Sequence, residues 1–462
     1  MAESSTRKVR RTHSKKDRIS VLPRNILETI LCFLPIQDAV RTSILSRSWR
    51  HCWTTIPNLV FDDDISSISF GTSECECNGL ELMVVKYVSV INKILILHDG
   101  PLLKFFLRFP SLCKARVIHD YLDQWIPLFS RKGIKQLTIL GYDRWHFTAH
   151  NFSSLGLTHL RLANFWFPCI PAFGGMTYTY LRIIELIGVA TTENSIFDCP
   201  VLEKLTLMVS YGLSHTNFRA PNLKCLHQHY REMISEYSSA GLENLREYSF
   251  RLSGDPPIMQ TETPNVVNVL SSLHKIEKFS IAKYFMRYLA AGGLPKRLSR
   301  PLSYLRTLSC FDINFTCLAE VSCLLCLIRS APNLCKLHIS VDPDPEEGNF
   351  EESSEEDFQD CSADQFQDCT ADHLEIVTFS HFQGLKAELE LVKFLLARSP
   401  LLKTMFIHRN LNMEKDVAFK SLEEMLEFSR ASSRAQIKSL KYPFGAVDYG
   451  PWVNDLDICD FV

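Results

Sequence analysis

The chain has 462 residues, of which 46% are hydrophobic and 22% are charged, and its formal net charge is −2. This composition is typical of globular proteins, and the length suits about three domains or one elongated array with an appendage. A net charge this close to zero excludes a global attraction to nucleic acid or to an anionic membrane surface. No uncharged run approaches the roughly eighteen apolar residues of a membrane span, so no such span is expected.

Basic and acidic residues are segregated along the chain. Residues 1–18 carry a balance of +5, whereas residues 342–372 hold thirteen acidic residues and no Lys or Arg. We expect residues 1–16 to form a disordered basic arm, which is a nuclear import signal, a nucleic-acid contact or a solvated tail. The 16 cysteines follow no signal peptide, so we expect reduced thiols in a protein of the nucleus, the cytoplasm or both.

Residues 17–57 have the pattern of three short helices. The first lies between two prolines, and the second covers about residues 37–45. A third begins at Ser46, a suitable N-cap, and carries Trp49 and Trp53 one turn apart. Three helices of this size bury too little surface to be stable alone. Their surplus of Leu and Ile therefore packs on the rest of the chain or docks a separate protein.

The same segment resembles a plant-type F-box over the full length of the motif. The residues that carry the resemblance are Arg18-Ile19-Ser20, Leu22-Pro23, Ile26-Leu27, Ile30-Leu31, Leu34-Pro35, Asp38-Ala39-Val40-Arg41-Thr42-Ser43 and Leu45-Ser46-Arg47-Ser48-Trp49-Arg50. In that family the helices dock on the Skp adaptor, which joins the F-box protein to a cullin–RING ubiquitin ligase. We expect Trp49 and Trp53 at the seam to the next domain. The predicted adaptor-binding face consists of Leu22, Pro23, Ile26, Leu27, Ile30, Leu31 and Leu34.

An apolar pattern recurs through residues 58–341 and again beyond them. Each copy has an apolar residue, two spacers, a second apolar residue, one spacer and usually a third apolar residue. From Leu137 onward the middle positions follow one another at 21 to 24 residues, and later at 28 to 40 residues. A period of about 20 to 29 residues with one short strand per copy is typical of leucine-rich repeats, and the longer copies leave room for a helix. The middle residues are Phe105, Leu137, Leu160, Ile184, Leu205, Leu226, Tyr248, Phe279, Leu308, Leu337, Val377, Met405 and Leu440.

Stacked repeats of this kind form a curved parallel sheet, with the apolar residues of each strand in the core. The residues between them point outward because strand side chains alternate. Basic residues outnumber acidic ones at the outward positions. This face is either an ordinary solvated surface or a mildly basic surface that binds an acidic or phosphorylated protein. The predicted substrate-face candidates are His159, Arg161, Lys204, His227, His229, Arg251, Lys278 and Lys336.

Residues 342–372 interrupt the repeats with an acidic segment. It contains few aliphatic side chains, so we expect it to be disordered. The segment is either an inert insertion or a segment that folds back onto the basic face and competes with substrate.

We expect residues 373–445 to form C-terminal repeats and a cap, and within them residues 374–407 resemble the FBD module that follows the F-box and leucine-rich repeats in a plant family. The matching residues are Phe382-x-Gly384, Glu388-Leu389-Glu390, Lys393-Phe394-Leu395-Leu396 and Leu402-Lys403-x-Met405-x-Ile407. An apolar stripe there predicts a helix between two repeat strands, which would cap the stack. The stripe consists of Leu385, Leu389, Val392 and Leu396. The tail, residues 446–462, has no interpretable pattern.

The sequence contains no motif of a phosphate-binding loop, a dinucleotide fold, a zinc protease or a serine hydrolase. The Cys323-Leu-Leu-Cys326 spacing lies in an apolar run without a second ligand pair, so we expect no catalytic residue, no metal site and no cofactor. The predicted fold class is α/β: a three-helix F-box, an irregular leucine-rich-repeat solenoid and an FBD-like C-terminal cap.

The predicted function is that of a non-catalytic substrate-recognition subunit of a Skp–cullin–F-box ubiquitin ligase. Such a subunit would hold a protein substrate near the ubiquitin carrier and so raise its effective concentration. Two alternatives stay open. One is a non-degradative protein scaffold bound to the Skp adaptor, and the other is a nuclear factor that contacts nucleic acid. The absence of an aromatic-plus-basic platform argues against the second.

Overall fold

The computed structural model describes residues 19, 21–62, 78–109, 116–146, 155–167, 178–191, 196–208, 217–230, 242–252, 270, 272–291, 295–343 and 371–441. The predicted basic arm and C-terminal tail lie outside these residues. The chain divides into two compact units. Unit 1 comprises residues 1–139 and 154–156, and unit 2 comprises residues 140–153 and 157–462. Each unit is described by itself.

Unit 1 starts with the helical segment that the sequence predicts. Its elements are α1 (Arg24–Leu31), α2 (Ile36–Arg41) and the 3-10 helices η1 (Thr42–Ile44) and η2 (Cys52–Thr55). Pro23 and Pro35 are the N-cap residues of α1 and α2. Their fixed φ and missing N–H suit the start of a helix, which is why each helix begins where it does.

The predicted third helix from Ser46 onward is wrong, and α2 is shorter than predicted. The Ser46 hydroxyl lies 2.7 Å from the Ser48 hydroxyl and caps no helix. The hydroxyls of Thr42 and Ser43 each donate to the carbonyl three residues earlier, at 2.6 Å. Such local side-chain bonds compete with helical hydrogen bonds. The chain therefore passes from α2 through η1 and turns into η2.

The rest of unit 1 alternates strands and helices. These elements are β1 (Asn58–Phe61), α3 (Asn78–Leu97), β2 (Lys104–Arg108), α4 (Arg116–Lys132) and the start of β3 (Gln136–His146). β1 and β2 pair in parallel. The Phe105 ring lies between them and the helices, with its centroid 5.6 Å from Phe61 and 4.7 Å from Phe129. No helix in the described ranges combines the length and the apolar character that a membrane span requires.

Unit 2 is a parallel sheet whose strands lie in chain order. They are β4 (His159–Phe167), β5 (Ile183–Ile187), β8 (Lys204–Met208), β10 (Cys225–Tyr230), β11 (Glu247–Leu252), β12 (Lys278–Ala282), β13 (Thr307–Ile313), β14 (Lys336–Val341), β15 (Ile376–Phe382), β16 (Thr404–Arg409) and β17 (Gln436–Lys441). The short β6 (Ala190–Thr191) pairs with β4, while β7 (Ile196–Asp198) and β9 (Asn217–Arg219) form a separate pair. Each predicted copy of the apolar pattern in this unit is one strand, so the repeat prediction is confirmed.

The apolar positions of neighbouring strands align in rows through the core of unit 2. Leu205, Leu226, Tyr248 and Phe279 are paired in register and buried. The copy in β10 has no third apolar residue because Gln228 stands there. Its side-chain amide donates to the Tyr230 hydroxyl at 3.0 Å and accepts from the Tyr248 hydroxyl at 3.2 Å, so both ends of this half-buried amide have a partner.

Asparagine side chains connect successive repeats where Pro-Asn-Leu or a related turn precedes a strand. The amides of Asn222, Asn244 and Asn333 donate to carbonyls of the preceding repeat at 2.7, 3.0 and 2.7 Å. These bonds satisfy carbonyls at the turns, where no strand partner is available.

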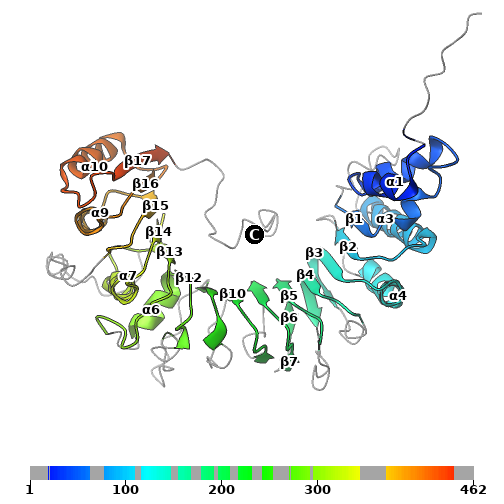
Figure 1. The fold of residues 1–462 in the computed structure, drawn as a ribbon, viewed down its shortest axis with the longest axis horizontal. Helices are drawn as coiled ribbons and strands as arrows, with labels where there is room; N and C mark the ends of the chain where they lie inside the picture. The colour runs from blue at the N-terminus through cyan, green and yellow to red at the C-terminus, as the bar shows by residue number, and fades with distance from the viewer. Residues whose placement is uncertain are drawn as a thin grey trace, which may run out of the picture. The chain divides into compact units, whose positions relative to one another are not determined.

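Helices occupy the longer repeats of unit 2, as the spacing predicts. They are α6 (Lys283–Ala291), α7 (Leu318–Ser330), α9 (Lys386–Arg398) and α10 (Lys415–Glu427). All four lie on the same side of their strands (Figure 1). The helix predicted in the FBD-like region is α9, between β15 and β16, so that prediction is confirmed.

The two ends of the predicted acidic segment, residues 342–372, pack against unit 2. Asp342 is buried at the end of β14, and its carboxylate lies 2.8 Å from the Lys283 ammonium. Ala371 is buried in the turn before β15. Both ends of the predicted 342–372 segment therefore belong to the packed unit, and residues 344–370 lie outside the described ranges.

Candidate functional site

The predicted adaptor-binding residues divide into a buried set and an exposed set. Leu27 and Leu31 are 3% and 0% exposed, so they belong to the core of unit 1 and are removed from the face. Ile26, Ile30 and Leu34 are 42%, 37% and 39% exposed. Of the remaining two, Pro23 is exposed and Leu22 is half-buried.

Four more apolar side chains are exposed beside this set but escaped the sequence prediction. Val21, Phe33, Ile44 and Leu45 are all more than half exposed, and Phe33 and Ile44 reach 85% and 87%. Ile44 follows the helical stripe of α2 in the sequence. The change to a 3-10 helix after Arg41 turns it away from that stripe. We name the seven exposed residues Val21, Ile26, Ile30, Phe33, Leu34, Ile44 and Leu45 the apolar face.

The segment that bears the apolar face is fixed to the rest of unit 1. The Glu28 carboxylate accepts from the Thr55 hydroxyl at 2.6 Å and from Arg24 at 3.0 Å. His98 Nε2 lies 2.8 Å from the Ile56 carbonyl. Trp49 and Trp53 are both buried, in accord with a role at the seam. The apolar face is therefore presented by an anchored segment.

The outward face of unit 2 brings several predicted substrate-face residues together, but it pairs them with acids. Arg161 and Lys204 approach the same carboxylate, that of Glu185, at 3.5 and 3.0 Å. Lys278 lies 3.2 Å from Glu247. Each acid comes from the strand next to its base. The register places Glu185 beside Arg161 and Glu247 beside Lys278, whereas Lys204 reaches Glu185 from two positions along its strand.

At these positions each base therefore lies beside an acid. Arg251 also lies 2.6 Å from an acid, Asp312. The count of basic and acidic residues at the predicted outward positions did not include Glu247 and Asp312, because each lies far from its basic partner in the sequence. Of the other predicted residues, the His159 ring contacts the Thr158 hydroxyl at 2.8 Å. His229 is half-buried on β10, and Lys336 is exposed on β14.

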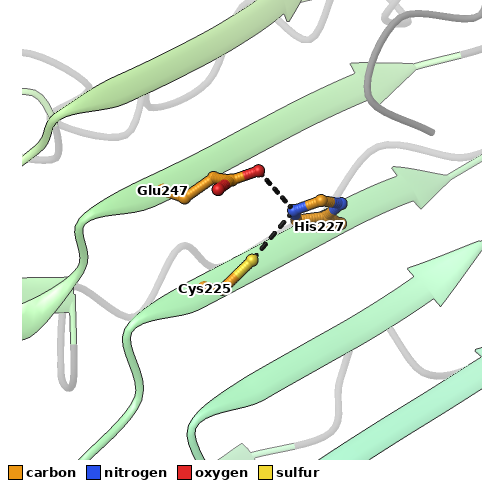
Figure 2. A group of neighbouring side chains, drawn as sticks. All are labelled: Cys225, His227 and Glu247. Carbon is orange, nitrogen blue, oxygen red and sulfur yellow. Dashed lines mark hydrogen bonds and ion pairs between the residues drawn. The ribbon is translucent and has the colours of Figure 1, made fainter. Parts of the chain in front are cut away.

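Cys225, His227 and Glu247 form a compact cluster on this face (Figure 2). Cys225 and His227 are two residues apart on β10, and Glu247 is the register partner of Cys225 on β11. His227 Nε2 lies 2.9 Å from Cys225 Sγ and 3.3 Å from Glu247 Oε1. Cluster A denotes these three residues below. Among the described residues it is the one group of three His, Cys, Asp or Glu side chains close enough to share an ion.

Cluster A does not have the arrangement of a catalytic relay. In a nucleophile–histidine–acid relay the nucleophile and the acid contact different ring nitrogens. Here both approach Nε2. Burial, with a smaller contribution from Glu247, raises the pKa of the Cys225 thiol to about 12, and a protonated thiol is a poor nucleophile. The hydrogen bond from His227 is the main cause that lowers the pKa of Glu247 to about 2.

Three family models match successive parts of the chain. An F-box domain matches residues 19–61, the leucine-rich repeats of an FBD-associated F-box protein match residues 122–339, and the FBD module matches residues 368–407. The order and extent of these matches agree with the helical segment, the parallel sheet and the β15–α9–β16 region.

Similar proteins in Arabidopsis thaliana extend these matches over nearly the whole chain. The F-box/FBD/LRR-repeat protein At1g13570 is 34% identical over 92% of this chain and 99% of its own length. The F-box/FBD/LRR-repeat protein At4g00160 is 28% identical over 42% of this chain and 41% of its own length. The apolar face lies within the F-box match, and the α9 repeat lies within the FBD match. This chain belongs to the F-box/FBD/LRR-repeat protein family.

Proposed function

We propose that this F-box protein is the substrate-recognition subunit of a Skp–cullin–F-box ubiquitin ligase. The observation that carries the proposal is the apolar face, which leaves seven apolar side chains exposed on a segment anchored to unit 1. Large apolar side chains left exposed in such number on one short segment are typical of protein interaction sites. An F-box implies a partner of the Skp type, and that adaptor is the proposed occupant of the face.

The chain itself would supply position and no chemistry. A bound substrate is held close to the ubiquitin carrier of the assembled ligase, which raises the effective concentration of its lysines. The proposed substrate surface is the outward face of unit 2. Because Glu185, Glu247 and Asp312 pair with its bases, we propose a protein with mixed polar groups as the substrate. This replaces the acidic or phosphorylated partner expected from sequence.

Adaptor binding is tested with the purified full chain and purified Skp adaptor. Ile26→Glu/Ile30→Glu places two charges on the apolar face and leaves Leu27 and Leu31 in the core. We expect binding to weaken at least about 100-fold, because each charge would be buried against an apolar partner at a cost above about 1.4 kcal/mol. Isothermal titration calorimetry measures this effect.

The matched control is Phe419→Glu/Leu426→Glu. These residues are 64% and 69% exposed on α10, which is also helical and lies in the other unit. The control variant should bind the adaptor as the wild type does. If the wild type does not bind, or if both double variants bind equally well, the proposed adaptor face is wrong.

Degradative and scaffold roles are distinguished in cells. Proteins captured with the wild-type chain are compared with and without a proteasome inhibitor, and the Ile26→Glu/Ile30→Glu chain serves as the reference. A partner that accumulates only with inhibitor, and only when adaptor binding is intact, supports a substrate role. A partner whose abundance is the same with and without inhibitor, and the same for both chains, supports the non-degradative scaffold.

A further inference from the structure

Cluster A combines three donor types that one metal ion can use together. Cys225 offers sulfur, His227 offers nitrogen and Glu247 offers oxygen, and the donor atoms all lie within 4.8 Å of one another. Sulfur and oxygen approach the same imidazole nitrogen from two strands (Figure 2). This convergence of three donors on one point is unsuited to a proton relay and suited to a coordination centre.

We infer that Cys225, His227 and Glu247 bind one zinc ion on the outward face of unit 2. Sulfur and imidazole ligands suit zinc, whereas magnesium and calcium take oxygen ligands. Three protein ligands leave one position of a tetrahedral site for water or for a donor atom of a bound partner. The inference goes beyond the proposed function, because it depends neither on adaptor binding nor on the fate of a substrate.

Two of the three donor separations are close to those of a tetrahedral zinc site. Tetrahedral zinc bonds of about 2.0 to 2.3 Å separate a nitrogen and an oxygen ligand by about 3.3 Å, and a sulfur and a nitrogen ligand by about 3.5 Å. The Nε2–Oε1 separation of 3.3 Å already has this value. The Sγ–Nε2 separation of 2.9 Å must widen by roughly 0.6 Å. Cys225 is half-buried, so a rotation of its side chain supplies that movement.

The surrounding charges are compatible with a cation. Lys278 lies 3.2 Å from Glu247 Oε2, so Oε1 is the oxygen that faces His227 and the proposed ion. Lys204 is held 3.0 Å from its own acid, Glu185. The Cys225 thiol gives up its proton to solvent when the sulfur–zinc bond forms. The thiolate and the Glu247 carboxylate then balance the two charges of zinc.

The backbone explains why these donors share a site. Residues i and i+2 of a strand lie on the same face, and register partners on adjacent parallel strands lie side by side. The pairing Cys225↔Glu247 therefore sets the acid beside the other two donors. His227 is buried, which limits the freedom of its ring and preorganises the site.

The test uses the full chain with cobalt chloride as a spectroscopic substitute for zinc. We expect one cobalt per chain at cluster A, with a thiolate-to-cobalt charge-transfer band in the near ultraviolet. Cys225→Ser should abolish that band. His227→Gln and Glu247→Gln should weaken zinc binding by more than the about 10- to 100-fold that loss of an outer-shell partner causes. A chromophoric chelator that competes for zinc measures this effect.

Cys335→Ser is the matched control, because Cys335 is also half-buried and stands immediately before a strand, β14. It should retain the band and the affinity. A wild type without the band, or a band that survives in Cys225→Ser, contradicts the inference. Circular dichroism checks that each variant is folded.

A second measurement needs no variant. Zinc chloride should slow alkylation of Cys225 by iodoacetamide at least about tenfold, as followed by peptide mass spectrometry, because the bound sulfur is blocked. Unchanged alkylation of Cys225 at saturating zinc also overturns the inference.

Discussion

Two repeats of unit 2, separated by the β14–β15 connection, stabilise their strand-to-helix turns differently. In the β13–α7–β14 repeat and in the β15–α9–β16 repeat, a glutamate at the third position of the helix is buried, Glu320 in α7 and Glu388 in α9. Glu320 accepts from the Asn314 amide at 2.7 Å, and Glu388 accepts from the Gln383 and Gly384 amides at 3.0 and 2.8 Å. Each carboxylate thus accepts hydrogen bonds from backbone N–H groups of the turn that leads from the strand into its helix.

The two carboxylates differ in their second oxygen. Glu320 Oε1 accepts from Arg287 Nε at 2.6 Å, whereas Glu388 Oε1 has no hydrogen-bond partner among the described residues. Burial raises the pKa of both groups, and it raises that of Glu388 to about 7. The leucine-rich repeat thus buries an ion pair, and the repeat within the FBD match buries a carboxyl group that can be neutral. Both shifts have the same sign, so ionisation of either carboxyl group costs stability, and the Arg287 guanidinium beside Glu320 opposes the shift there.

The largest expected effect comes from removing the acid of the buried pair. Glu320→Ala leaves the half-buried Arg287 guanidinium without its carboxylate, and it leaves the Asn314 backbone amide without this acceptor. We expect the free energy of unfolding to fall by about 3 to 5 kcal/mol. Urea denaturation followed by circular dichroism measures this change. Glu320→Gln, which keeps an acceptor, should lose less. Equal stability of wild type and Glu320→Ala would mean that the pair contributes nothing.

The next effect depends on pH and concerns Glu388. Its folded pKa of about 7 lies above its ordinary value of 4.5. The protonated group is therefore favoured in the folded state, and wild-type stability should fall as pH rises from about 4.5 to 7. We expect a loss of roughly 3 kcal/mol across this window. Glu388→Gln should remove this loss and be the more stable protein at pH 8. Parallel pH profiles of the two proteins would contradict the neutral carboxyl group.

A smaller effect is expected at Gly384, whose amide donates to Glu388. Its φ is +81°, and an added Cβ would lie 2.6 Å from Ser421 Oγ and 2.8 Å from Met413 Cε. Gly384→Ala should lower the stability by about 1 to 3 kcal/mol. Gly133→Ala is the control for backbone strain alone, because Gly133 has φ +72° and no atom within 4 Å of an added Cβ. Equal losses in thermal denaturation would show that the contacts at Gly384 are unimportant.

The smallest effect is expected for an exposed ion pair in the FBD-like repeat. Lys403 lies 2.7 Å from Glu375, and both side chains are largely exposed. Water and salt screen such a pair. Lys403→Ala should therefore leave the thermal midpoint within experimental error. A clear drop in the thermal midpoint would show that this exposed pair stabilises the fold, as the Arg287–Glu320 pair is expected to do.

The sheet was predictable because its signal is local. Each strand carries its apolar residues at fixed spacing, and the pattern survives where single copies are degenerate, as at Gln228. The helix α9 was predictable for the same reason, since its stripe includes the buried Val392 and Leu396. The end of the F-box segment was not predictable, because the side-chain hydrogen bonds of Thr42 and Ser43 redirect the chain and no helix begins at Ser46.

The candidate sites were only partly predictable because they depend on tertiary neighbours. Spacing places Ile26 and Leu27 on one apolar stripe, but only packing against the rest of unit 1 decides that Leu27 is buried. Glu247 stands twenty residues after His227, so no short motif joins them. The parallel register brings them together, and it also supplies the acids that neutralise the outward bases.

The pairing of β14 with β15 has a consequence for how such chains can vary. Leu337 and Val377 are register partners although forty residues separate them, whereas twenty-one residues separate the partners Ile184 and Leu205. Closing a flexible connection costs only about 0.6 kcal/mol more for each doubling of its length. A connection between two strands can therefore lengthen, or change its composition, with little loss in the stability of the sheet. Related chains are free to diversify these connections while the order of the strands is inherited intact.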